Sequence, residues 1–539
     1  MPHSFRMRAA LAVLSGLVLA LAFPRFDVNL MAWVALVPLL SAIDGAPPHR
    51  MFALGWLQGF ACNVVGLYWI TITLHTFAGV RIELAVLPML LLAAVVALYT
   101  GAAVWTAGFV TTRIDVPIVV TFPIAWTALE WVRTYFPIGF PWNLLGYAAY
   151  RNLALIQFAE FTGVYGVSAL IALFNVVVYV VVFQRERPRT QGIALATLSA
   201  LVAAAWVFGA ARLDELARAR PAGTMRVAMV QGDIPQSLKW NPTFLETSFD
   251  VYVAQSEEAA RLGADLTVWP EAAAAFFFQP DNRYPAAFAG DASFRQRLLN
   301  LAAQTRVPIL FGAPALGVED GRVGFYNRAY LVSGKGEVVD WYDKIQLVPF
   351  GEYVPLRSLL GGLVNRIVSG FGDMFPGRRQ TMFNLNGAKL GVLICYESIF
   401  PHLASGAARL GANILVNITN DAWYGDSSAP YQLLAMAAMR SVETKLPMVR
   451  VANTGVSAVI EPSGEIVART PLFKRGTEIE RVAWRRGRTV YAMVGDIFAE
   501  LCFVLTIVGL WFGVRQRPAA PTEVVEAPPL QVANGRPRL

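Results

Sequence analysis

Cysteine and charged side chains are scarce in this sequence, and their scarcity limits what the protein can be. The 539 residues include three cysteines, and 15% of the residues are charged whereas 56% are hydrophobic. Three cysteines are too few for a disulfide framework. Soluble globular proteins have about 25% charged residues, so a large part of this chain must face lipid. The four histidines are scattered, and we predict no metal site.

Basic residues outnumber acidic ones, with a formal charge of +8 at pH 7 and a pI near 9.4. Such a balance can favour nucleic acid. Here, however, the arginines cluster beside apolar segments, where they orient a membrane protein and meet anionic lipid. We therefore predict a membrane as a partner and no nucleic acid.

Eight apolar stretches have about the length that crosses a bilayer, roughly 20 residues. They cover residues 9–23, 28–44, 52–75, 83–110, 116–134, 153–183, 192–211 and 493–514. The basic start of the chain, followed by Ala20, Leu21 and Ala22, also resembles a cleaved signal peptide. Because further membrane segments follow at once, we favour an uncleaved first helix.

The stretch between the seventh and eighth apolar segments has a different pattern, with short apolar runs, helical periodicity and turn residues. The sequence thus predicts a transmembrane domain of seven helices (1–215), an α/β domain (220–490), an eighth transmembrane helix (491–515) and a disordered cytoplasmic tail (516–539). The tail is rich in proline, alanine and valine.

Arginine distribution predicts the orientation, because cytoplasmic loops carry an excess of basic residues. One side would hold Arg6, Arg8, Arg50, Arg113, Arg185, Arg187, Arg189, Arg515 and Arg517, and the other Arg25, Arg81, Arg133 and Arg151. The first group is the larger and should be cytoplasmic. We therefore expect the α/β domain outside the cytoplasm.

Strands and helices alternate within the α/β domain. The predicted strands are 225–230, 266–269, 309–312, 328–332, 390–394, 414–417, 448–452 and 457–460, and the predicted helices are 245–262, 294–304, 402–410 and 431–445. This alternation around buried sheets fits an α/β sandwich.

Three residues in this domain suit catalysis as a set. Glu271 follows a strand, Lys344 lies in a turn-rich loop and Cys395 ends a hydrophobic strand. Singly, each has an ordinary structural interpretation: a capping glutamate, a solvated lysine and a small buried hydrophobe. Together they match what a reactive thiol needs, a base and an electropositive neighbour. In this order they resemble the catalytic triad of the nitrilase, or carbon–nitrogen hydrolase, superfamily.

The domain order and further segments resemble the apolipoprotein N-acyltransferase family more closely. The matching segments are 230–236, 239–240, 347–355, 419–425, 453–455 and 461–464, of which Pro-Phe-Gly-Glu-Tyr-Val-Pro at 349–355 is the most specific. Two departures lie outside the triad. Residues 272–275 are all alanine where the family usually has a proline, and Leu433 stands where the family often has histidine.

The resemblance implies an N-acyltransferase that works by ping-pong acyl transfer without a cofactor. Cys395 would attack a phospholipid ester and form a thioester, with Glu271 as base and Lys344 stabilising the oxyanion. The acceptor would be the α-amino group of the N-terminal diacylglyceryl-cysteine of apolipoproteins, in the last step of lipoprotein maturation. Such an enzyme would lie in the bacterial inner membrane, with its catalytic domain facing the periplasm.

Four further residues have implied supporting roles. Glu352 and Glu397 would orient Lys344 or the incoming amine, or serve as structural hydrogen-bond partners. Trp240 and Tyr396 would border the acyl pocket, or be core aromatics. The aromatic run 276–278 and the stretch 359–375 have the composition of lids or membrane-dipping loops, with a buried aromatic run as the alternative.

Two rival functions share parts of this pattern. A membrane-anchored amidase would use the same triad but would not need so many helices. A transporter or scaffold with an inactive nitrilase-like domain is disfavoured by the small number of charges central to the membrane segments, where Glu130 and Glu160 are the main exceptions.

Overall fold

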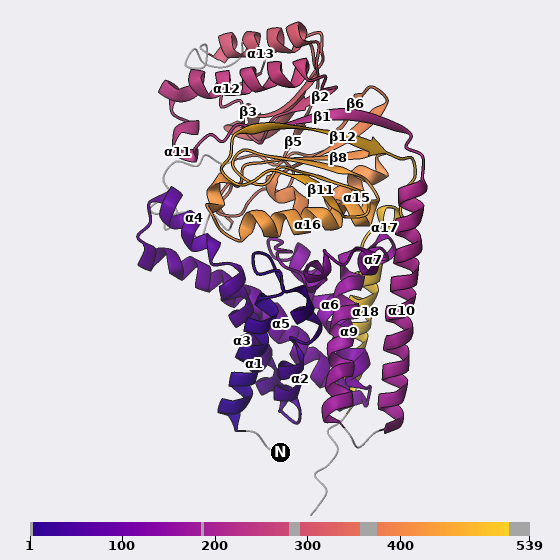
Figure 1. The fold of residues 1–539 in the computed structure, drawn as a ribbon. Coiled ribbons are helices and arrows are strands. Elements are labelled where there is room, and N and C mark those ends of the chain that lie inside the picture. Colours follow the sequence, from indigo (N-terminus) through magenta and orange to yellow (C-terminus); the bar gives the residue numbers. More distant parts are fainter. Residues whose placement is uncertain (1–3, 185–187, 280–290, 356–373, 517–539) are drawn as a thin grey trace, which may run out of the picture.

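The computed structural model describes residues 4–184, 188–279, 291–355 and 374–516. It consists of a helical membrane domain and an α/β domain stacked on one end of it, with the long helix α10 running alongside into the first strand (Figure 1). The predicted arginines Arg185, Arg187 and Arg517, residues 359–373 of the predicted lid and residues 517–539 of the predicted tail lie outside the described residues.

The membrane domain is built from helices of very unequal length. They are α1 (Phe5–Ala20), η1 (Asn29–Trp33), α2 (Val37–Ile43), α3 (Pro48–Gly66), α4 (Trp69–Ala78), α5 (Ile82–Ile114), α6 (Ile118–Tyr135), η2 (Leu145–Ala149), α7 (Leu153–Ile156), α8 (Ala159–Thr162), α9 (Val164–Phe183), α10 (Pro188–Arg218), α17 (Val490–Val494) and α18 (Ile497–Arg515). Among the described residues, α5, α9, α10 and α18 are long and apolar enough to cross a membrane, and α3 with α4, bent by 47°, makes a fifth span if counted as one.

The structure therefore establishes a multi-helix membrane domain but not a count of eight spans. Three predicted spans are interrupted. Residues 52–75 break between α3 and α4. Residues 28–44 form the short helices η1 and α2, and residues 153–183 form α7, α8 and then α9. Gly163, in the left-handed region at φ +64°, separates α8 from α9 and turns the chain between them.

Two six-stranded sheets form the α/β domain. The strands are β1 (Gly223–Gln231), β2 (Leu266–Val268), β3 (Ile309–Glu319), β4 (Arg322–Val332), β5 (Val338–Asp343), β6 (Met382–Leu385), β7 (Ala388–Ile394), β8 (Ile414–Thr419), β9 (Met448–Ala452), β10 (Ala458–Ile460), β11 (Ile466–Arg469) and β12 (Gly476–Trp484). Their orders are β12-β1-β2-β3-β4-β5 and β11-β10-β9-β8-β7-β6. Strands β1-β2-β3 and β7-β8-β9 pair in parallel.

Helices cover the outer face of each sheet (Figure 1). They are α11 (Gln236–Lys239), α12 (Pro242–Arg261), α13 (Asp291–Thr305), α15 (Pro401–Arg409) and α16 (Ala429–Thr444), with the short turns η4 (Cys395–Ile399) and η5 (Asp421–Tyr424). The two inner faces share one apolar core, and the predicted α/β sandwich is confirmed. A second core runs without a break from α15 and α16 into the membrane helices, so the two domains are packed together.

The aromatic run 276–278 is not the lid that its composition suggested. Phe276 and Phe278 are 2% and 0% exposed and lie in the core beside α12 and α13. Phe277 stacks on Phe325 with ring centroids 5.9 Å apart. The buried aromatic run, the alternative interpretation, describes this segment.

Candidate active site

Three strand ends bring Glu271, Lys344 and Cys395 together. Glu271 follows β2, Lys344 follows β5 and Cys395 follows β7, and the facing of the two sheets sets these ends side by side. The Lys344 Nζ lies 3.5 Å from Glu271 Oε1, and the charges of Glu271 and Lys344 both act on the Cys395 thiol. All three side chains are buried. The set predicted from three distant segments is thus one cluster.

Cys395 sits on a tight turn between β7 and η4. Its φ is +53°, a left-handed conformation that residues with a Cβ rarely adopt. Neighbouring polar groups hold the turn: Ile394 N donates to Glu397 Oε2 at 2.7 Å, Ser398 Oγ donates to the Cys395 carbonyl at 3.0 Å, and Asn417 Nδ2 donates to the Leu393 carbonyl at 3.0 Å. Strain of this kind persists only where the surroundings determine the backbone.

Glu271 is fixed on both carboxylate oxygens and on its carbonyl. Asn327 Nδ2 donates to Oε1 at 2.6 Å, and the backbone N–H of Asn420 donates to Oε2 at 2.9 Å. The carbonyl accepts from Lys239 Nζ at 2.9 Å, and the next residue, Ala272, has φ +47°. These contacts leave the carboxylate little freedom to rotate away from the thiol.

Glu352 is the closest ionic partner of Lys344. Glu352 Oε1 lies 2.8 Å from Lys344 Nζ and also accepts from Asn327 Nδ2 at 3.1 Å, while Oε2 accepts from Val348 N at 2.8 Å. Lys344 therefore bridges two carboxylates, Glu352 and Glu271, and Asn327 donates to both of them. Such a bridge fixes the position of the ammonium group, whose charge acts on the Cys395 thiol.

Glu397 makes a different set of contacts. Its Oε1 accepts from the Tyr342 hydroxyl at 2.8 Å, from Ile345 N at 2.6 Å and from Gln346 N at 3.1 Å, while its Oε2 caps the turn at Ile394. Glu397 thus ties the segment after Lys344 to the turn that carries Cys395. It acts on Lys344 through the backbone rather than through a direct ion pair.

Burial and neighbouring charges set the protonation states. Burial, reinforced by the Glu271 charge and opposed by that of Lys344, raises the pKa of the Cys395 thiol to about 12. Burial would also raise the pKa of Glu271, but the Lys344 ammonium and the Asn327 amide outweigh burial and lower it. The carboxylates of Glu352 and Glu271 outweigh burial and raise the pKa of Lys344. At neutral pH the cluster holds a thiol beside a carboxylate and an ammonium group.

The predicted aromatic residues lie in contrasting environments. Trp240 follows α11 and is 52% exposed, so it is not a core aromatic. Tyr396 is 3% exposed, and its hydroxyl donates to the Gly139 carbonyl of the membrane domain at 3.1 Å. The residue next to Cys395 is thereby joined to the loop after α6.

The sequence analysis did not single out two buried polar residues that contact Glu271, Lys239 and Asn327. Burial lowers the pKa of Lys239 to about 8, and its Nζ faces the Glu271 carbonyl. Asn327 lies within β4, where asparagine is unfavourable, and this misfit was the signal available in the sequence. In the described part of the chain, no three His, Cys, Asp or Glu side chains gather as metal ligands.

Comparisons with known proteins cover both domains. A family described as carbon–nitrogen hydrolase matches residues 226–489, and one described as the apolipoprotein N-acyltransferase N-terminal domain matches residues 15–177. An amidase from Nesterenkonia sp. is 22% identical, covering 51% of this chain and 95% of its own, with a TM-score of 0.36. The apolipoprotein N-acyltransferase of Geobacter metallireducens is 39% identical over 91% of this chain and 92% of that protein. The one of Brucella melitensis is 35% identical over 86% and 88%. The chain belongs to the apolipoprotein N-acyltransferase family.

Proposed function

We propose that this protein transfers a fatty acyl chain from a membrane phospholipid, through a thioester on Cys395, to the α-amino group of the N-terminal diacylglyceryl-cysteine of apolipoproteins. The observation that carries the proposal is the buried cluster of Glu271, Lys344 and Cys395 directly beside a membrane domain. The names of the relatives indicate the class of acceptor, and the cluster provides the base, the cation and the nucleophile for acyl transfer.

In the first half-reaction Glu271 takes the proton of the Cys395 thiol, and the sulfur attacks the ester carbonyl carbon. Lys344, whose Nζ is 3.5 Å from Glu271 Oε1, stabilises with its ammonium group the oxyanion that develops. The C–O bond to the glycerol oxygen breaks, and Glu271 returns the proton to that oxygen. A lysophospholipid leaves, and the acyl group remains on the sulfur as a thioester.

In the second half-reaction the α-amino nitrogen of the acceptor attacks the thioester carbonyl. Glu271 accepts a proton from the attacking amine, the C–S bond breaks, and the proton passes to the departing sulfur. An amide forms, and the thiol is restored. Burial of Cys395 keeps water from the thioester, which would otherwise be hydrolysed.

Placement beside the membrane suits two substrates that both carry fatty chains. Extracting such a chain into water costs about 0.8 kcal/mol per CH₂, and a site joined to the outer end of a membrane domain avoids this extraction. We further propose that the membrane is the bacterial inner membrane and that the catalytic domain faces the periplasm. Reporter fusions after Arg220 should therefore read as extracytoplasmic, and a cytoplasmic reading would overturn this orientation.

The test of the function is a single-turnover experiment on the full-length protein in bilayer discs. With phospholipid and no acceptor, the protein should release about one lysophospholipid per enzyme and retain a hydroxylamine-sensitive acyl group on Cys395. A peptide with an N-terminal diacylglyceryl-cysteine should discharge the group and yield an amide, whereas the same peptide with a blocked α-amine should not. Continuous lysophospholipid release would indicate a phospholipase. Absence of any adduct together with turnover of a small amide would indicate an amidase.

A further inference from the structure

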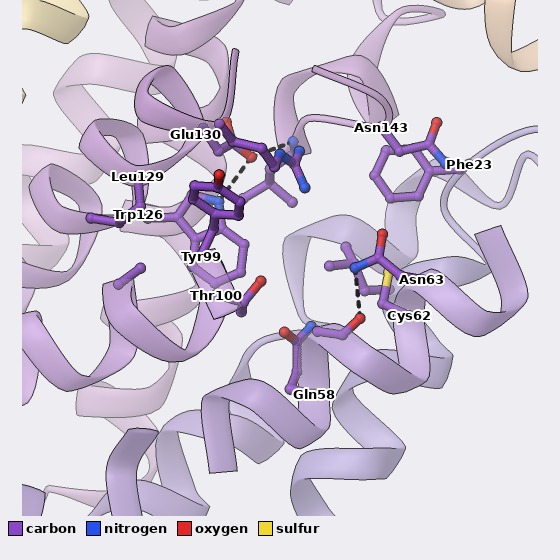
Figure 2. Close-up of a pocket in the computed structure, with 15 residues that line it drawn as sticks. Phe23, Gln58, Cys62, Asn63, Tyr99, Thr100, Trp126, Leu129, Glu130 and Asn143 are labelled. Atoms are coloured by element: carbon purple, nitrogen blue, oxygen red, sulfur yellow. Dashed lines mark hydrogen bonds between the residues drawn. The ribbon is translucent and has the colours of Figure 1, made fainter. Parts of the chain in front are cut away.

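A small polar cavity lies inside the membrane domain between α1, α3, α5 and α6 (Figure 2). Its volume is about 40 Å³. Its polar lining comes from Gln58, Asn63, Tyr99, Thr100, Glu130, Arg133 and Asn143. Such a concentration of polar groups is unusual inside a membrane domain, where unpaired polar groups are unfavourable.

Three buried side chains at the cavity have atoms without protein partners in the described part of the chain, and one of these atoms is Glu130 Oε2. Gln58 is 1% exposed, and within the described residues neither its Oε1 nor its Nε2 has a hydrogen-bond partner. Arg133 is 8% exposed, and its Nε is likewise unpaired in that part of the chain. Buried polar groups without protein partners are commonly satisfied by water. A cavity of this size holds about two or three water molecules.

Among the described residues, no salt bridge within 4.0 Å joins Glu130 and Arg133, although each charge acts on the other at longer range. Each instead holds the loop that follows α6. Glu130 Oε1 accepts from Leu145 N at 2.7 Å and from Trp126 Nε1 at 3.0 Å. One terminal nitrogen of Arg133 donates to the Trp142 carbonyl at 3.2 Å. One turn of α6 thus holds both Trp142 and Leu145.

The other side of this loop, residues 136–145, contacts the catalytic domain. The Gly139 carbonyl accepts from the hydroxyl of Tyr396, the residue after Cys395, at 3.1 Å. Trp142 Nε1 donates to Gln432 Oε1 at 2.8 Å, and its ring lies 4.8 Å from that of Trp69. Glu130 and Arg133 of α6 therefore hold the loop by hydrogen bonds, and the same loop contacts Tyr396, the residue next to Cys395.

We propose that Glu130 and Arg133, together with water bound in this cavity, form an anchor that positions residues 136–145 against Tyr396 for acyl transfer. The ligand of the cavity is water, and the two charged residues are positioning residues that act on the reaction through the loop. Only the activity readout of this inference rests on the proposed function of Cys395.

Hydrogen–deuterium exchange of the full-length enzyme in bilayer discs tests the anchor directly. Arg133→Met and Glu130→Leu should speed amide exchange in residues 136–145, while Glu130→Gln, which keeps an acceptor oxygen, should change it little. Thr127→Val is the matched control, since Thr127 is buried on the same helix but does not line the cavity. Unchanged exchange in both Arg133→Met and Glu130→Leu would overturn the anchor.

The acylation kinetics of the same variants distinguish a positioning role of Glu130 and Arg133 from a purely structural one. Arg133→Met and Glu130→Leu should slow formation of the acyl-enzyme by about 10- to 100-fold, the scale expected when a positioned group is displaced, with a smaller change in KM. Faster loop exchange with a wild-type acylation rate would overturn the functional role. If the wild-type protein forms no acyl adduct at all, the proposed function fails, while the exchange result still decides the anchor.

Hydroxyl-radical footprinting tests the water. Cys62 lines the cavity and points into it beside Asn63 (Figure 2), whereas Cys502 is a buried cysteine of α18 outside it. With radicals generated from water in bilayer discs, Cys62 should be oxidised faster than Cys502. Equal or slower oxidation of Cys62 would overturn the hydration of the cavity.

Discussion

Two buried polar clusters in this protein use charge in opposite ways. In the proposed catalytic cluster (Glu271, Lys344, Glu352 and Cys395), Lys344 approaches its two carboxylates at 2.8 and 3.5 Å, and the charges of Glu271 and Lys344 act on the thiol. In the proposed loop anchor (Glu130 and Arg133), no salt bridge within 4.0 Å joins the two charges, and their hydrogen-bond partners are neutral backbone groups and the Trp126 indole. In the functions proposed above, the close opposite charges serve a proton transfer, whereas the more widely separated charges hold a loop in place. The catalytic cluster should therefore be the more sensitive to substitution.

Removing the thiol should have the largest effect. Cys395→Ala should abolish both acyl-enzyme formation and transfer, because no other nucleophile takes its place, while the fold remains intact. Intact-mass analysis after exposure to phospholipid measures the first effect, and circular dichroism checks the second. An acyl adduct on Cys395→Ala would place the nucleophile elsewhere and break the comparison.

Neutralising Glu271 should change the acylation rate and the pKa of the Cys395 thiol, and the two effects can be measured separately. Glu271→Gln should slow acylation by about 10²–10⁴, the usual contribution of a general base. Because burial and, after it, the Glu271 charge raise the pKa of the Cys395 thiol to about 12, removing that charge in the same variant should lower the pKa. The pH dependence of Cys395 alkylation, followed by mass spectrometry, measures the shift. A thiol pKa that rises in Glu271→Gln would contradict the charges assigned to the cluster.

Lys344→Met should slow acylation by about 10²–10³, the typical loss of one oxyanion donor. It should also raise the pKa of the thiol, since the Lys344 charge lowers it. Lys344→Arg should restore activity only in part, because a planar fork replaces a point charge. Lys389→Met, at an exposed position on β7 itself, is the control. If Lys344→Met forms the acyl-enzyme at the wild-type rate, Lys344 does not stabilise the oxyanion.

The titration of Glu397 should appear in stability rather than in chemistry. Burial, opposed by hydrogen bonds from Ile394, Gln346 and Tyr342, raises the pKa of Glu397 to about 7. A raised carboxyl pKa favours the folded state below about pH 4.3, and this contribution is lost as the pH rises through about 7. The melting temperature of the wild-type protein relative to Glu397→Gln should therefore be higher at pH 5 than at pH 8. A pH-independent difference would contradict the assignment.

The smallest effect is expected at Cys502. This residue is buried in α18 among apolar neighbours, in neither the catalytic cluster nor the loop anchor. Cys502→Ala should leave acyl-enzyme formation and transfer within about twofold of wild type, as is usual for a substitution away from special sites. A large loss of activity at wild-type expression would reveal a function for α18 that the contacts do not suggest.

Strand prediction succeeded inside the two sheets and failed at their edges. The eight predicted runs correspond to β1, β2, β3, β4, β7, β8, β9 and β10, whereas β5, β6, β11 and β12 were missed. The four missed strands are the outermost strands of the two sheets. An edge strand is partly exposed and carries mixed side chains, so it lacks the apolar run that marks an inner strand. Exposure therefore decided which strands the sequence could reveal.

The prediction of membrane helices was limited by a different ambiguity. Hydropathy located the apolar regions, but it does not distinguish one long helix from short helices separated by a turn. Residues 153–183 are uniformly apolar apart from a few polar side chains, yet the chain turns at Gly163. The turn depends on packing: a Cβ at Gly163 would lie 2.5 Å from the ring of Tyr491, a residue more than 300 positions later in the chain.

The sequence by itself determined the class of the protein, a membrane enzyme family with a nitrilase-like domain, and it predicted a site made of a glutamate, a lysine and a cysteine. The membrane and α/β character follows from composition and periodicity, whereas the family and its triad are implied by the resemblance of motifs along the chain. Tertiary structure alone decided which polar groups support that set. Hydrogen bonds join Asn327 to Glu271, Glu397 to Ile345 and Tyr396 to Gly139. The partners are 56, 52 and 257 positions apart in the sequence. A hydrogen bond depends on distances of a few tenths of an ångström, and only the packed sheets and helices set distances between segments so far apart in the chain.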